Sequence, residues 1–101
     1  MEIKIRKEGS RLHMNIIGKI DESGAEELKQ CFYKIDRSDI SEVIFDFKEV
    51  SYIGSACIGK LLLFYKEMGD TGGNIRIINA SADVYEMIRL VKLETILNIS
   101  K

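Results

Sequence analysis

The segment that decides the fold is Val50-Ser-Tyr-Ile-Gly-Ser-Ala-Cys-Ile-Gly-Lys-Leu-Leu-Leu63, in which an apolar strand is predicted to turn directly into an apolar helix. Ser55 lies at this turn, where the first N–H groups of the helix lack internal partners and the helix dipole adds partial positive charge. A phosphoserine would be stabilised there. Serine is also a preferred N-cap, and on local sequence alone we favour the simple capping interpretation.

Size and composition predict one domain over residues 1–101. The chain is 46% hydrophobic and 31% charged, as in ordinary soluble globular proteins. Its net charge of −1 argues against direct nucleic-acid binding. Charged residues follow Met1 at once and no apolar run is long enough to cross a bilayer, so we expect no secretory signal, no membrane insertion and a cytoplasmic location.

The sequence assembles no recognisable active site. Cys31 and Cys57 are far apart and His13 is the only histidine, so we predict free thiols, no disulfide and no metal site. The glycine-rich segment 69–74 lacks the Lys-Ser/Thr pair of a phosphate-binding loop and is interpreted as a helix end and a turn. We therefore expect a protein that is not an enzyme and needs no cofactor.

The hydrophobic pattern predicts an α/β chain. Alternation around 3–5 and 12–16 on either side of a turn at 8–10 indicates a hairpin whose second strand ends at Gly18. Ser23 and Glu26 form a capping-box pattern before the first helix. Later elements are expected as strand 43–47, helix 55–68, strand 75–78, a helix capped by Ser81, and a short strand or helical turn over 95–99. This order predicts a four- to five-stranded mixed sheet with three or four helices packed on one face.

The helix that begins at Ser55 is more apolar than one buried stripe requires. Ile58, Leu61, Leu62 and Tyr65 follow one stripe, and Cys57, Phe64 and Met68 continue around the helix. We favour burial between the first and third helices over an exposed binding patch, and both remain open.

With Ser55 on a strand-to-helix turn in this element order, the chain resembles the STAS domain, the family of bacterial anti-sigma-factor antagonists. The family pattern aromatic-apolar-Asp-Ser-(Ser/Thr/Ala)-Gly-Leu-Gly is similar to Tyr52 to Gly59. Ile17 to Asp21 resembles the apolar-Gly-x-apolar-Asp element before the first helix, Gly72-Gly73 resembles the turn before the next strand, and Leu90 to Leu97 resembles the closing segment. The resemblance covers nearly the whole chain, and these four pieces occur in the family's order and spacing.

The resemblance implies a regulatory binding module that is switched by phosphorylation. Unphosphorylated members bind a serine kinase that is also an anti-sigma factor; phosphorylation of the serine that matches Ser55 blocks the complex, and a metal-dependent serine phosphatase restores it. The phosphate adds roughly −1.5 to −2 charges to the contact surface. The partner-binding positions implied here are Asp21, Gly54, Ser55, Ala56, Cys57, Lys60 and Phe64. Asp21 has the alternative role of capping the turn before the first helix.

Two departures from the family pattern keep alternatives open. Gly54 replaces the aspartate that precedes the serine, and Cys57 replaces a glycine. They favour a phosphorylation-independent STAS adaptor in a signalling or lipid-transport complex as the alternative function. A thiol-based redox sensor at Cys57 is a further hypothesis, since helix N-termini favour thiolates, although a semi-buried inert thiol is the favoured interpretation of this residue.

Overall fold

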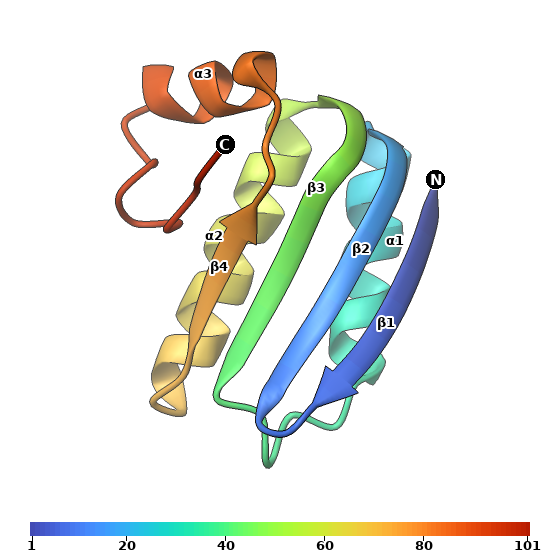
Figure 1. Ribbon diagram of the computed structural model, residues 1–101, viewed down its shortest axis with the longest axis vertical. Helices are drawn as coiled ribbons and strands as arrows, with labels where there is room; N and C mark the ends of the chain where they lie inside the picture. The colour runs from blue at the N-terminus through green and yellow to red at the C-terminus, as the bar shows by residue number, and fades with distance from the viewer.

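A computed structural model describes residues 1–101. In chain order its elements are β1 (Glu2–Glu8), β2 (Arg11–Ile20), α1 (Glu22–Lys34), β3 (Glu42–Ile53), α2 (Ser55–Asp70), β4 (Asn74–Ile78) and α3 (Ala82–Leu90). The strands form one sheet in the order β1-β2-β3-β4, antiparallel between β1 and β2 and parallel elsewhere (Figure 1). This confirms the predicted α/β class, with a four-stranded mixed sheet and three helices.

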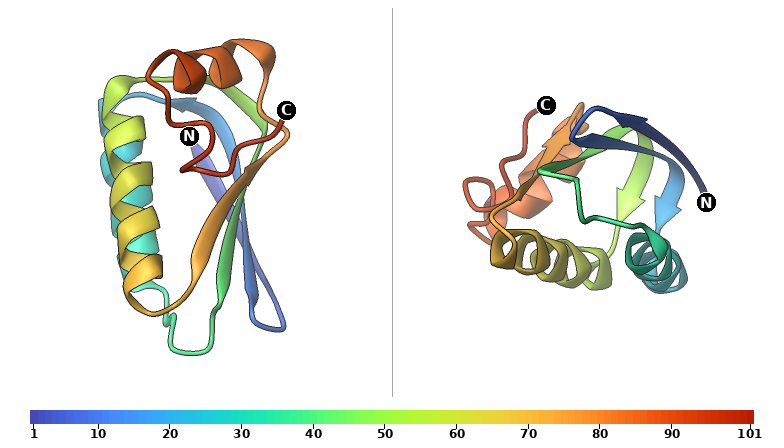
Figure 2. Two further views of the ribbon diagram at one scale, coloured as in Figure 1. Left: turned by 90° about the vertical axis from the view of Figure 1, so that its left-hand side faces the viewer. Right: turned by 90° about the horizontal axis from the view of Figure 1, so that it is seen from below.

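The two faces of the sheet differ in chemistry. Met14, Phe45 and Ile77 lie in one row across three strands and are fully buried. The helices α1 and α2 lie side by side over this face, while the opposite face has no covering layer (Figure 2). That uncovered face carries polar and charged side chains, as in the neighbouring row of His13 and Arg76 on either side of Ile44. The amphipathic strands therefore place the core between the sheet and the two helices.

Three strands deliver their carboxyl ends to one edge of the sheet. There β2 leads into α1, β3 leads into α2, and β4 leads into α3 (Figure 1). Parallel strands require this arrangement, since each crossover begins where its strand ends. The N-termini of α1 and α2 are consequently neighbours, although more than thirty positions separate Glu22 from Ser55 in the sequence.

At this edge the two strands β2 and β3 are longer than the sequence predicted. The strand β3 extends to Ile53 rather than ending at Phe47, and β2 continues beyond Gly18 to Ile20. Gly18 has a φ of +111° and lies at a register shift between β2 and β3, so glycine allows a bulge here and the strand continues beyond it.

The third helix does not enclose α2 as we expected. It lies across the end of the sheet, and α2 packs against α1, β3 and β4 (Figure 2). The segment after α3 consists of turns followed by a single parallel bridge from Ile99 to Ile77. This segment returns along β4 and covers the outer side of that strand. The Ser100 N–H donates to the Ile77 oxygen at 2.9 Å.

Candidate functional site

The candidate site is built where α1 and α2 begin side by side. The N–H of Gly54 donates to the carbonyl oxygen of Ile20 at 2.9 Å, which ties the start of α2 to the end of β2. The next residue after Ile20 is Asp21, the N-cap of α1. A single backbone hydrogen bond therefore places the exposed side chains of Asp21 and Ser55 at the same end of the molecule.

Ser55 is the first residue of α2 and is exposed. The N-cap position belongs to Gly54, whose backbone is extended, with φ −95° and ψ 173°. No side chain caps this helix, and its first turn contains no acidic residue. The interpretation of Ser55 as a cap is thus wrong. Its hydroxyl stands beside a helix N-terminus whose dipole no side-chain charge in that turn offsets, a setting that favours a bound anion.

Glycine at position 54 is not required by the backbone. Its φ is negative, and an added Cβ would lie 3.7 Å from the Tyr52 hydroxyl oxygen and 3.8 Å from the Ile20 carbonyl oxygen, both ordinary contacts. A residue with a Cβ, such as aspartate, is therefore compatible with the backbone here. The missing carboxylate is therefore a property of the site's surface and is not imposed by the fold.

The start of α1 has the opposite character. Oδ1 of Asp21 accepts the N–H of Gly24 at 2.8 Å, and Glu22 adds a carboxylate to the first turn. Asp21, rather than Ser23, therefore caps α1. The predicted capping box is wrong because Asp21 leads the chain into the helix two positions earlier. Asp21 remains exposed while it caps, so the capping role and a partner-facing role are compatible.

A shallow groove runs between the first turns of the two helices. Its lining residues are Glu22, Ser23, Glu26, Glu27, Gln30, Ala56 and Lys60. Lys60 reaches across it to Glu26, with 3.6 Å between Nζ and Oε2. A hydrogen bond from Gln30, together with the charges of Lys29 and Lys60, lowers the pKa of Glu26. The α1 wall of the groove is therefore acidic, and its lysine is already paired.

Two of the predicted partner-binding side chains cannot reach a partner from this surface. Cys57 and Phe64 are fully buried, because the buried stripe of α2 is Cys57, Leu61, Phe64 and Met68 rather than the stripe expected from the sequence. Phe64 stacks on Phe32 with 4.2 Å between ring centroids. Burial raises the pKa of the Cys57 thiol to about 12, which contradicts the redox-sensor hypothesis.

The remaining predicted positions lie at this end of the helix pair. Asp21 and Ser55 are exposed, and Gly54, Ala56 and Lys60 are half-buried. Tyr52, which sequence reasoning used only to recognise the motif, is 48% exposed beside Gly54 and adds an aromatic surface to the site. The exposure of Tyr52 could have been predicted from the sequence, because it comes directly before the buried Ile53 and neighbouring strand residues face opposite sides of the sheet.

Solved structures share this fold over most of the length of this chain. An anti-sigma factor antagonist from Mycobacterium paratuberculosis superposes with a TM-score of 0.85 at 17% identity, covering 97% of this chain and 83% of that one. Phosphorylated SpoIIAA, a Bacillus cell fate determinant, gives a TM-score of 0.76 at 15% identity, covering 99% and 92%. Murine Slc26a9, an anion transporter, gives 0.78 at 18% identity, covering 93% of this chain and 16% of that one.

These identities establish likeness of fold alone. No curated protein matches the sequence. No helix combines the length and apolar character needed to span a membrane. The family model described as STAS domain, however, matches residues 2–101, which is nearly the whole chain. The chain belongs to the STAS domain family.

Proposed function

We propose that this chain is a regulatory binding module that works by partner switching and is controlled by phosphorylation of Ser55. The observation that carries the proposal is the exposed Ser55 hydroxyl on a helix start with no side-chain cap and no acidic residue in its first turn. The likeness to SpoIIAA and to the mycobacterial anti-sigma factor antagonist supports the same class of function.

The electrostatics around Ser55 explain how such a switch would work. A phosphate adds roughly −1.5 to −2 charges. The backbone N–H groups of α2 can hold it, so the fold need not change. On the neighbouring helix lie Asp21, Glu22 and Glu26, and Glu26 already pairs with Lys60. A partner that contacts the neutral hydroxyl would meet a bulky, more negative surface after phosphorylation, and the complex would weaken.

The partner in this proposal is a serine kinase that also acts as an anti-sigma factor, and a metal-dependent serine phosphatase removes the phosphate. The contact surface comprises Asp21, Gly54, Ser55, Ala56 and Lys60, with Tyr52 as an added aromatic contact. In this proposal the module works in the cytoplasm without catalysis of its own. When it binds the kinase, which is also the anti-sigma factor, the sigma factor is released and transcription changes.

The test compares binding of the kinase by purified variants. We expect Ser55→Glu to weaken binding at least about tenfold, a loss of about 1.4 kcal/mol, and Ser55→Ala to bind like wild type. Ser10→Glu is the matched control, since it adds the same charge at an exposed position in the turn between β1 and β2, at the other end of the sheet from Ser55. Melting temperatures should stay close to wild type in all three variants. The switch fails if Ser55→Glu binds as tightly as wild type and kinase with ATP leaves Ser55 unmodified.

One observation favours a second candidate, a constitutive STAS adaptor in a signalling or lipid-transport complex. The backbone at position 54 is compatible with aspartate, yet this chain has Gly54. The fold of this chain is also similar to a segment of the Slc26a9 transporter, and this chain covers 16% of that much longer chain. Ser55→Glu with unchanged affinity for a partner captured from the native cell would support the adaptor over the switch.

A further inference from the structure

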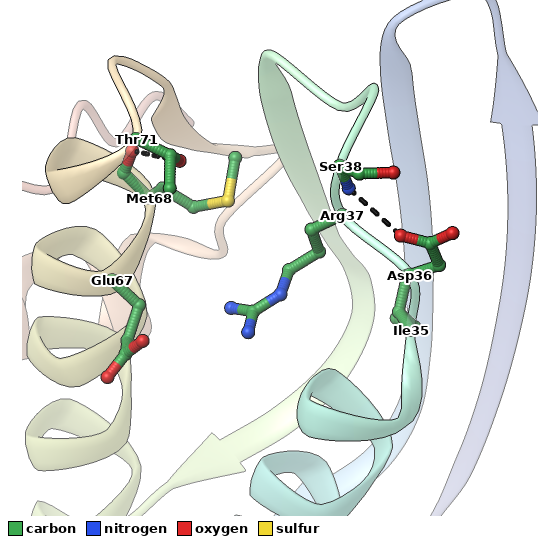
Figure 3. Close-up of a pocket in the computed structure, with 7 residues that line it drawn as sticks. All are labelled: Ile35, Asp36, Arg37, Ser38, Glu67, Met68 and Thr71. Atoms are coloured by element: carbon green, nitrogen blue, oxygen red, sulfur yellow. Dashed lines mark hydrogen bonds between the residues drawn. The ribbon is translucent and has the colours of Figure 1, made fainter.

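A second concave site lies at the opposite end of the helix pair from Ser55. It is a pocket of about 310 Å³ between the loop that follows α1 and the last turn of α2 (Figure 3). Small-molecule sites span about 300–1,000 Å³, so only a small ligand would fit. Its lining residues are Ile35, Asp36, Arg37, Ser38, Glu67, Met68 and Thr71.

Arg37 is the one arginine of the chain without an ionic partner. The other four are each paired with a glutamate: Arg6 with Glu8, Arg11 and Arg76 with Glu42, and Arg89 with Glu86. No ion pair or hydrogen bond to another residue engages the Arg37 guanidinium. Figure 3 shows this side chain extending from its loop into the gap in front of α2. Its N–H donors are therefore free to bind a ligand.

The guanidinium is nevertheless held in place. Its Cζ lies 4.2 Å from the centroid of the Phe32 ring, a cation–π contact, and 5.6 Å from that of Tyr33. Phe32 is fully buried and stacks on Phe64, so the platform under Arg37 belongs to the rigid core. A fixed, planar fork of N–H donors matches the two oxygens of a carboxylate.

The other side of the pocket carries negative charge. Glu67 comes from α2 and accepts a hydrogen bond from the Tyr33 hydroxyl at 3.5 Å. Asp36 lies beside Arg37 on the same loop, and Figure 3 shows its carboxylate turned towards Ser38 and away from the gap. Its Oδ1 accepts the N–H of Ser38 at 3.1 Å, and this hydrogen bond lowers the pKa of the Asp36 carboxyl. The Glu67 carboxylate would repel a simple anion that approached Arg37. A ligand with a positive group beside its carboxylate would satisfy both sides.

We propose that this pocket binds a free α-amino acid, with its carboxylate on the Arg37 guanidinium and its ammonium group on the Glu67 carboxylate. Ser38 and Thr71 also line the pocket, and the Thr71 hydroxyl already donates to the Met68 carbonyl oxygen at 3.0 Å. The site is independent of the Ser55 switch, because it lies at the far end of the helix pair and shares no residue with that surface. It would give the module a small-molecule input in addition to phosphorylation.

The test is a titration of the full chain followed by amide chemical shifts, with three probes of similar size. L-Alanine carries both charges, propionate lacks the ammonium group, and ethylamine lacks the carboxylate. We expect L-alanine to shift the amides of residues 36–38 and 67–71 in a saturable way, and each single-charge probe to bind at least about tenfold more weakly. A tenfold change is about 1.4 kcal/mol, close to the lower end of what one hydrogen bond to a charged group contributes.

Variants assign the binding to the two charges. Arg37→Gln and Glu67→Gln should each weaken L-alanine binding at least about tenfold, and Arg37→Lys should also weaken it because lysine lacks the planar fork. Arg6→Gln is the matched control, since Arg6 lies on the uncovered sheet face and should leave binding unchanged. Ser55→Glu should also leave it unchanged, which separates this site from the switch.

Three results would overturn the amino-acid site: no saturable shift with L-alanine, equal affinity for L-alanine and propionate, or full binding by a folded Arg37→Gln variant. The amide spectrum of each variant reports whether it is folded. If Arg37→Gln lost its fold, the Glu67→Gln variant would decide the outcome alone, because Glu67 is partly exposed and its only side-chain hydrogen bond is the one from Tyr33.

Discussion

The two helices that begin at the same edge of the sheet start in different ways. The helix α1 has an aspartate cap at Asp21 and an acid, Glu22, in its first turn. The helix α2 begins after Gly54 with neither a side-chain cap nor an acid in its first turn. Both starts are tied to neighbouring strands, so the difference lies in their charge. The first helix end already has the negative charge that its dipole favours, while the second offers that place to a ligand or a modification.

The same turn of α2 also separates two chemistries by direction. Ser55 faces water, and Cys57, two positions later, faces the core. A thiol near a helix start would normally become more acidic, yet burial among apolar side chains raises the pKa of Cys57 to about 12. The positive end of the helix dipole therefore acts on the exposed Ser55 side chain, and it does not lower the pKa of the buried Cys57 thiol.

The largest expected effect is the pH dependence of stability that comes from the buried Cys57 thiol. Burial raises the folded-state pKa of Cys57 from 9.0 to about 12, so its neutral form stabilises the fold fully below pH 9, and this contribution is lost as the pH rises towards 12. Each pH unit in that window costs about 1.4 kcal/mol. Urea unfolding at pH 8 and pH 10 should show wild type losing about 1–2 kcal/mol more than Cys57→Ala. Equal losses would show that the thiol is not held neutral.

Much of the fold was predictable because amphipathic patterns depend on residues close together in sequence. The hairpin, the strand around Phe45, the start of α2 at Ser55 and the Ser81 cap all follow from such local signals, and the Ser81 side chain does accept the Val84 N–H. The position of α3 across the end of the sheet was not predictable, because its apolar stripe fixes which face is buried but not the partner that buries it.

The candidate site was predicted in part. Its location followed from the strand-to-helix turn at Ser55. The sequence did not show which residues of α2 would be exposed and which would be buried. Phe64 and Tyr65 are adjacent and both aromatic, and tertiary contacts with Phe32 and Phe45 decide that Phe64 is the buried one. The acidic wall from α1 was missed because its residues meet α2 through a long-range contact, the pairing of Lys60 with Glu26.

An intermediate effect compares the two helix starts directly. Asp21→Ala removes the cap of α1 and should destabilise the protein by about 1 kcal/mol. Ser55→Ala removes an exposed hydroxyl that caps nothing, and surface changes of this kind usually stay within about 0.5 kcal/mol. Chemical denaturation of both variants measures the contrast. If both variants lost the same stability, the Ser55 hydroxyl would be capping α2 in solution, and the two helix starts would be alike.

The smallest expected effect comes from giving α2 the acid that it lacks. Gly54→Asp places a carboxylate at an N-cap whose backbone is already extended and whose surroundings leave room for a Cβ. A better cap adds a few tenths of a kcal/mol over glycine, and the charge near the helix start adds about 0.3–1 kcal/mol at low salt. At the lower ends of these two contributions we expect a net gain of about 0.6 kcal/mol, measured by chemical denaturation.

Gly54→Asn separates the two contributions to this gain, because asparagine caps as well as aspartate but carries no charge. The advantage of aspartate over asparagine should fall in 1 M salt, where charges are screened within about 3 Å. A loss of stability in both variants would mean that the first N–H groups of α2 already have partners. The helix start would then have no room for an anion, and the electrostatic basis for holding a phosphate on Ser55 would be removed along with the contrast between the two helices.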